Sequence, residues 1–312
     1  MSAPAVREDR RWVILAVLAI ISLPLLLVLL EAVSFYVQNR NNGTLVSSGK
    51  TREYLLYVPA SYDRSKPAPL VISMHPAGMW PSFQREASGW DKLADEHGFI
   101  VVYPAGRGVP RIFPVDGWRT PSQMPEVRFV ADLIDKLVAT YNIDPARIYA
   151  DGFSNGGGIA FVLSCTLSDR IAAVGLVSSA QLLPWKWCTD TRPVPMIALH
   201  GTADTFTPYD GGKTFIHFSP FPSIPVWTDN WAKRNHCGAS PGESMVAADV
   251  MRRAYANCAD NADVVLYTIQ GGGHTWPGGA LLPEWFVGTT NYNIDASRVM
   301  WAFFQEHPLS RK

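Results

Sequence analysis

Hydrophobic positions along the chain follow two patterns: one long apolar run near the N-terminus, and then a repeated alternation of short apolar runs with helical periodicity. Short apolar runs bounded by Pro, Gly or Ser predict strands. The predicted strands are 54–58, 69–74, 99–104, 147–150, 172–178, 195–200 and 263–269. The last three are almost continuously apolar, which is typical of strands covered on both faces of a sheet.

Helical patterns lie between these strands. Residues 90–98 predict a helix that ends at Gly98, and apolar positions of 129–141 recur at the 3.6-residue spacing of an amphipathic helix. Alternating strands and helices predict an α/β fold with a mostly parallel central sheet and helices on both faces. Residues 205–245 are rich in Pro, Gly and aromatic residues, and we interpret them as excursions over the sheet rather than a second domain.

The apolar run near the N-terminus, residues 12–30, contains no charged residue. As a helix it would be about 28 Å long, close to the hydrocarbon thickness of a bilayer. Arg7, Arg10 and Arg11 precede it, so the positive-inside rule places the N-terminus in the cytoplasm. We therefore predict four segments: a cytoplasmic N-terminus (1–11), a transmembrane anchor (12–33), a polar tether (34–50) and an exported folded domain (51–312).

A cleaved signal peptide is the alternative interpretation of the same run. The run is longer than the usual apolar region of a signal peptide, about 7–15 residues, and no A-x-A-like cleavage site follows it. Arg10-Arg11 also resembles a twin-arginine signal, although two adjacent arginines are weak evidence. In either case the domain is periplasmic or extracellular, either membrane-anchored or secreted after cleavage.

Charge and cysteine content narrow the class of protein. The chain has 27 basic and 27 acidic residues and no basic run, so nucleic-acid binding is not expected. Four cysteines in an exported domain suggest disulfides, and four cysteines allow three pairings. The cysteines and histidines do not have metal-ligand spacing, and we predict no metal or other cofactor.

The sequence RIYADGFSNGGG predicts a strand, a sharp turn and a helix, and its turn contains G-x-S-x-G centred on Ser154. This motif typically holds a nucleophilic serine, because the strained turn requires residues without side chains two positions before and after it. A phosphate-binding loop would need Lys-Ser/Thr after its last glycine, and Ile159-Ala160 follows here. Ser154 is therefore the candidate nucleophile.

A catalytic serine needs a histidine base and an acid, which follow it in the order Ser, Asp/Glu, His in this fold. His274 lies in a glycine-rich loop just after the strand 263–269 and is the candidate base. Asp204 and Asp210 follow the strand 195–200, and Asp204 is preferred because it is nearer the strand end, where α/β sheets concentrate catalytic groups.

Two other histidines are interpreted differently: His200 as structural, and His307 as solvated in a polar tail.

An oxyanion hole requires two backbone N–H donors. The residue after the nucleophile, Asn155, would supply one. The loop SMHPAGMW would supply the other, and because Pro76 has no N–H, Ala77 is the first candidate and Gly78 the second.

The motifs GFSNGGG, LHGTADTFTPYDGG, NHCG, NCAD and IQGGGHTWPGG resemble the polyhydroxybutyrate-depolymerase and feruloyl-esterase-like α/β hydrolases, over roughly residues 50–306. The resemblance implies the triad Ser154, Asp204 and His274. It also implies disulfides Cys237–Cys258 and Cys165–Cys188. The loop His75-Pro76-Ala77 departs from the H-G-C or H-G-T that such proteins commonly carry.

These observations predict a serine esterase that cleaves carboxylic esters, small or oligomeric, through an acyl-enzyme. Trp80, Trp118 and Trp276 are candidates for lining the substrate pocket, with core or lid packing as the alternative for each. An acyltransferase with the same triad, a peptidase, and a non-catalytic binding or scaffold protein are the alternative functions.

Overall fold

The computed structural model describes residues 6–38, 40–108, 111–114, 124–213, 220–279 and 282–310. Two units are distinguished, Met1–Arg40 and Asn41–Lys312. The first contains one helix, α1 (Val6–Gln38), which includes a segment, Trp12–Glu31, that is long and apolar enough to cross a membrane. None of this segment is buried by other described residues, so its apolar side chains lack a protein partner there.

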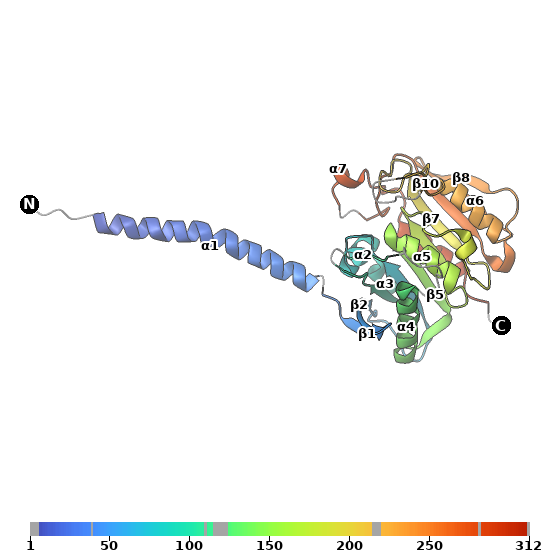
Figure 1. Cartoon of the computed structure of the whole chain (residues 1–312), viewed down its shortest axis with the longest axis horizontal. Helices are drawn as coiled ribbons and strands as arrows, with labels where there is room; N and C mark the ends of the chain where they lie inside the picture. The colour runs from blue at the N-terminus through green and yellow to red at the C-terminus, as the bar shows by residue number, and fades with distance from the viewer. Residues whose placement is uncertain are drawn as a thin grey trace, which may run out of the picture. The chain divides into compact units, whose positions relative to one another are not determined.

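The second unit is built on a sheet to which the described residues contribute ten strands (Figure 1). The strands are β1 (Gly43–Ser47), β2 (Lys50–Tyr57), β3 (Ala68–Met74), β4 (Ile100–Pro104), β5 (Ile143–Phe153), β6 (Val174–Val177), β7 (Met196–Gly201), β8 (Gly242–Ala247), β9 (Val250–Tyr255) and β10 (Val264–Ile269). Their order is β1-β2-β4-β3-β5-β6-β7-β10-β9-β8. The six strands from β4 to β10 in this order pair in parallel, and the two strands at each edge are antiparallel.

Helices cover both faces of the sheet, as the alternating pattern predicts. The helices are α2 (Pro81–Ser88), α3 (Trp90–His97), α4 (Pro125–Thr140), α5 (Asn155–Thr166), α6 (Ile224–Arg234), α7 (Glu284–Val287) and α8 (Ala296–Glu306), with short 3-10 turns at Trp185–Trp187 and Ala259–Asn261. One core cluster joins α4, α5 and α6 to one face of the sheet, and a second joins α2, α3 and α8 to the other. The central strands are thus buried on both sides, which explains their continuous apolar runs.

The predicted tether over 34–50 is not a separate segment. Helix α1 continues to Gln38, and β1 forms a hairpin with β2. Ser48 and Gly49 connect the two strands with positive φ angles of 50° and 72°, as a two-residue hairpin turn requires. The partly buried Leu45 packs against the core, so this polar-looking stretch adds an edge strand to the domain.

The described part of 205–245 contains α6 and the start of the β8–β9 hairpin. One further expectation differs from the structure. His307 is buried rather than solvated: its ring stacks on Phe303 at 4.0 Å, and its Nδ1 lies 2.6 Å from the Phe303 carbonyl oxygen. The tail therefore folds back onto the domain.

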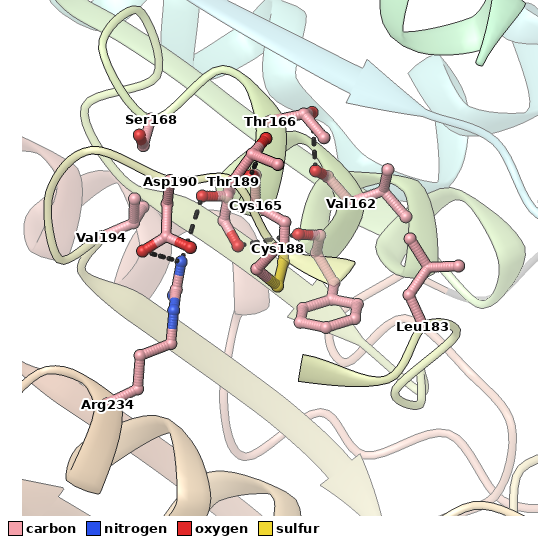
Figure 2. The surroundings of a disulfide bond; sticks show 12 residues. Val162, Cys165, Thr166, Ser168, Leu183, Cys188, Thr189, Asp190, Val194 and Arg234 are labelled. Carbon is pink, nitrogen blue, oxygen red and sulfur yellow. Dashed lines mark hydrogen bonds and ion pairs between the residues drawn. A yellow bond between two sulfur atoms is a disulfide. The ribbon is translucent and has the colours of Figure 1, made fainter. Parts of the chain in front are cut away.

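Two disulfides, Cys165–Cys188 and Cys237–Cys258, have the pairing that the family resemblance implies. The first joins the end of α5 to the segment that precedes β7, and Arg234 of α6 forms an ion pair with the neighbouring Asp190 (Figure 2). Both bonds are typical of proteins that fold in oxidising compartments.

Candidate active site

Ser154 lies at the turn between β5 and α5, with φ 55° and ψ −118°. This left-handed φ is strained for a residue with a side chain, and such strain is typical of functional turns. The Ser154 N–H donates to the Val177 carbonyl (2.8 Å), and its own carbonyl accepts from the Gly158 N–H (3.0 Å). The backbone on both sides of the serine is therefore held, while its side chain is partly exposed at the start of α5.

Both glycines of the G-x-S-x-G motif are required by close backbone packing. A Cβ at Gly152 would overlap the backbone of Gly156, and a Cβ at Gly156 would overlap the carbonyl of Met74 on β3. The turn therefore brings β3, β5 and α5 together without space for even one methyl group at these positions.

Asp204 and His274 meet although 70 residues separate them in the sequence. The His274 Nδ1 lies 2.8 Å from Asp204 Oδ2, and both side chains are buried. Asp204 Oδ1 accepts hydrogen bonds from the backbone N–H groups of Phe206 (2.9 Å) and Thr207 (2.7 Å). Burial alone would raise the pKa of Asp204, but the hydrogen bond and charge of His274, with His200 and the Thr207 N–H, lower that pKa below its usual range. The carboxylate thus stays ionised and orients the imidazole.

His200 supports this loop and does not replace His274. Its Nε2 donates to the Thr207 carbonyl (2.7 Å) and lies 3.5 Å from Asp204 Oδ2. Burial lowers the pKa of His200, partly offset by the charge of Asp204. A neutral, hydrogen-bonded histidine fits the structural role that the sequence suggests for it. Asp210, the other candidate acid, is exposed.

The His274 ring packs against two aromatic side chains. Its centroid is 5.1 Å from that of Phe153 and 5.0 Å from that of Phe206. Phe153 immediately precedes Ser154 at the end of β5, so this packing brings the histidine loop against the serine turn.

The two candidate donors for the oxyanion hole lie in loops that contact each other through the chain around Phe113. The Asn155 side chain accepts from the Phe113 N–H (2.9 Å) and donates to its carbonyl (3.0 Å). The Gly78 N–H donates to the Arg111 carbonyl (2.7 Å), which leaves Ala77 as the candidate donor of its loop.

Ala77 is exposed, and the loop that carries it is ordered by the buried His75. The His75 Nδ1–H donates to the Pro76 carbonyl (2.7 Å), and its Nε2 accepts from the Gly106 N–H (2.9 Å). Burial lowers the pKa of His75 to about 4, against the opposing effect of the Pro76 hydrogen bond. The ring is neutral near pH 7, as these two hydrogen bonds require.

The three candidate pocket tryptophans have different positions. Trp276 is 2% exposed, its indole N–H donates to Ser297 Oγ (3.2 Å), and its ring packs edge-on against Phe153. Trp80 is partly exposed at the N-terminal end of α2. Trp118 lies outside the described residues. A small cavity of about 10 Å³ lies beside His274, and Trp276 forms part of its wall.

A potential metal centre is not found in the described residues, where His, Cys, Asp and Glu side chains form no group of three or more that could hold a metal ion.

The family model "Esterase PHB depolymerase" matches residues 52–183 of the chain, a range that includes the candidate residues Ala77 and Ser154. The chain carries a domain of this esterase family. The matched range and the names of the relatives agree with the predicted esterase family.

Two relatives are similar in sequence over about three quarters of this chain. Feruloyl esterase B from Piromyces equi is 30% identical over 233 residues, covering 72% of this chain and 42% of that protein. An esterase named NocK from Nocardia uniformis subsp. tsuyamanensis is 28% identical over 259 residues, covering 75% of this chain and 73% of that protein. The chain thus spans less than half of the first relative and most of the second.

A solved structure, the acetyl xylan esterase from Aspergillus awamori, matches with a TM-score of 0.57 at 15% identity, over 82% of this chain and 94% of that one. At this identity the likeness concerns the fold. Together with the mostly parallel sheet, it fits the predicted α/β-hydrolase fold for the unit Asn41–Lys312.

The sequence alone does not identify the two aromatic residues that contact the His274 ring. Phe153 is the variable position of G-x-S-x-G, and Phe206 lies two residues after Asp204. Their positions beside two candidate triad residues are a usable signal, but only the folded chain brings both rings to the same imidazole.

Proposed function

We propose that the chain is an exported, membrane-anchored serine esterase. The observation that carries the proposal is the buried Asp204–His274 pair, packed through Phe153 against the strained turn that presents Ser154. Such a nucleophile, base and orienting acid are the components of acyl transfer through a covalent intermediate.

In the proposed reaction, Ser154 Oγ attacks the ester carbonyl carbon while His274 Nε2 accepts the serine proton. Asp204 holds the Nδ1–H tautomer and stabilises the imidazolium. The N–H groups of Ala77 and Asn155 hold the negative charge that develops on the carbonyl oxygen. His274 then protonates the leaving alcohol, and water, activated by the same histidine, hydrolyses the acyl-enzyme.

The direct test measures hydrolysis of p-nitrophenyl acetate and butyrate by the full-length chain. Ser154→Ala should lower kcat by about 10⁴-fold or more. Ser61→Ala, which changes an exposed serine, is the matched control and should retain activity. Unchanged hydrolysis in Ser154→Ala would exclude this serine as the nucleophile.

The choice of acid is tested in the same way. Asp204→Asn should lower kcat by several orders of magnitude because the imidazole loses its orienting charge, by about 10⁴-fold in the best-studied triad. Asp210→Asn removes the exposed alternative acid and should keep wild-type kcat. The opposite result would transfer the role to Asp210.

We propose that Trp12–Glu31 spans the membrane. Support comes from its length, its apolar composition and the exposure of its large side chains. The test is membrane fractionation of cells that express the full chain, followed by alkaline carbonate extraction and N-terminal sequencing. An intact chain retained in the membrane pellet supports an anchor, and a soluble chain that begins after residue 30 indicates a cleaved signal.

The natural ester is proposed at the level of its class. The relatives are named as feruloyl, acetylxylan and poly(3-hydroxyalkanoate) esterases and depolymerases, so we propose a carboxylic ester of a small or oligomeric substrate. Product analysis with added sugar acceptors distinguishes hydrolysis from acyl transfer by the same triad, since a transferase would yield acylated sugar in place of free acid.

A further inference from the structure

Helix α7 presents two large aromatic side chains to solvent. Trp285 is 84% exposed and Phe286 is 49% exposed, although exposed side chains of this size forgo the free energy of burial. The helix lies at the periphery of the domain (Figure 1). Exposed aromatic residues that adjoin a reaction centre are typical of ligand-binding surfaces.

These two side chains continue a row of aromatic rings that begins at His274. The Phe206 centroid is 5.0 Å from His274 and 5.3 Å from Phe286, and the Phe286 centroid is 5.8 Å from Trp285. We call Phe206, Phe286 and Trp285 the aromatic strip. The Phe206 N–H also donates to Asp204 Oδ1, so the strip begins within the Asp204 loop.

The exposed end of the strip is held in place by backbone contacts to the histidine loop. The His274 N–H donates to the Val287 carbonyl (2.6 Å), and the Gly273 N–H donates to the Thr289 carbonyl (2.9 Å). Val287, the last residue of α7, is buried. A Cβ at Gly273 would overlap the Val287 carbonyl, so the two segments are packed as closely as backbones allow.

Two surroundings adjoin the His274 ring. Phe153 and Trp276 line a small cavity of about 10 Å³, which has room for about one water molecule. Phe206 instead leads outward to the open strip. A long or aromatic group would therefore need the strip.

We propose that the aromatic strip binds an apolar or aromatic alcohol portion of the ester. The proposal rests on the proposed esterase function. His274 must protonate the leaving alcohol oxygen, so the alcohol portion departs past the imidazole, and Phe206 is the part of the strip that contacts that ring. The carbonyl oxygen, in contrast, must face the Ala77 and Asn155 loops. The ester would thus lie across the site with its alcohol toward α7.

Two isomeric esters separate the two sides of the site. Benzyl acetate carries its aromatic ring on the alcohol and methyl phenylacetate carries it on the acyl group, and ethyl acetate has no ring. Hydrolysis of all three by the full-length chain in lipid nanodiscs is followed by pH-stat titration. Trp285→Ala and Phe286→Ala are compared with wild type and with Tyr292→Ala, which removes another exposed aromatic residue of the same region.

Loss of the exposed aromatic surface should raise the KM for benzyl acetate about tenfold in Trp285→Ala and Phe286→Ala, as expected when an aromatic contact is removed. The kcat for ethyl acetate and the KM for methyl phenylacetate should stay within about twofold of wild type. Tyr292→Ala should leave all three substrates unchanged.

Three outcomes would overturn the proposal: equal KM values for benzyl acetate in all variants, a selective loss on methyl phenylacetate, or changed retention of the protein on vesicles with no change in KM. Failure of the esterase function itself is recognised separately. In that case wild type and Ser154→Ala would hydrolyse ethyl acetate at the same rate.

Discussion

The serine turn and helix α7 differ in how closely they are packed. At the turn, Gly152 and Gly156 leave no room for a single Cβ, and the backbone of three elements is in contact. At α7, Trp285 and Phe286 stand largely in solvent on a helix of four residues. The contrast indicates that Ser154 is positioned by close backbone packing, whereas the side chains proposed to bind the substrate are exposed and contribute little to folding.

The largest effect is expected at the turn. Gly156→Ala forces a methyl group into the Met74 carbonyl, a backbone atom that cannot move aside. The variant should lose about 3 kcal/mol or more of unfolding free energy and most of its esterase activity. Gly242→Ala, which places its methyl group in open space on β8, is the control and should change stability by less than about 1 kcal/mol. Urea denaturation and initial rates measure both, and equal stability would show that the turn is not closely packed.

The second-largest loss of stability is expected when the disulfide Cys165–Cys188 is removed, which tests whether the serine turn depends on this distant bond. The double variant Cys165→Ser/Cys188→Ser opens a disulfide between residues 23 positions apart, at the end of α5 opposite to Ser154. Releasing the constraint on the unfolded chain should cost about 3 kcal/mol. Rates at 25 °C, where the domain is still folded, should stay near wild type. A folded variant without activity would show that the serine turn depends on this distant bond.

A buried carboxyl below the turn should produce a pH-dependent effect. Asp151 is fully buried three residues before Ser154, and its Oδ1 accepts from Ser73 Oγ (2.6 Å), which in turn accepts from Gln84 Nε2 (2.9 Å). Burial raises the pKa of Asp151 to about 7, opposed by the hydrogen bond from Ser73. The folded chain therefore binds this proton more tightly than the unfolded chain, whose Asp pKa is about 3.9.

The resulting contribution to stability is present below pH ~4 and is lost as pH rises toward 7. Asp151→Asn keeps an acceptor for Ser73 and removes the ionisation. At pH 8 it should be about 4 kcal/mol more stable than wild type, and near pH 4 the difference should vanish. Urea denaturation between pH 4 and 8 measures this. A parallel pH dependence in the two proteins would exclude Asp151 as the source.

The smallest effect is expected at α7. Trp285→Ala should change the unfolding free energy by less than about 0.5 kcal/mol, because the side chain is mostly exposed. Thermal unfolding measures the difference, with Val287→Ala as the comparison, since Val287 is buried and its truncation should cost about 1–3 kcal/mol. A large loss in Trp285→Ala would mean that this tryptophan supports the fold rather than a substrate.

Sequence reasoning identified the centre of the fold better than its edges. The central strands appear as continuous apolar runs because both of their faces are covered, whereas β1, β8 and β9 lie at the sheet edges with weaker patterns. The Ser48-Gly49 turn was a usable signal for the first hairpin, since two consecutive positive φ angles favour such residues. His307 was misread because a short polar tail looks the same whether it is solvated or packed.

What the sequence by itself determined is the local chemistry: a strand, a glycine-flanked serine and a helix, followed by an acid and a histidine that each come just after a buried strand. These features depend on residues close together in the chain, so the pattern of apolar and polar side chains is enough to predict them. The tertiary structure decided which groups meet, such as Asp204 with His274 and Phe206 with Phe286. It also left Ala77 rather than Gly78 as the candidate donor, because the Arg111 carbonyl takes the Gly78 N–H. Such contacts join segments tens of residues apart, and only the folded backbone sets their distances.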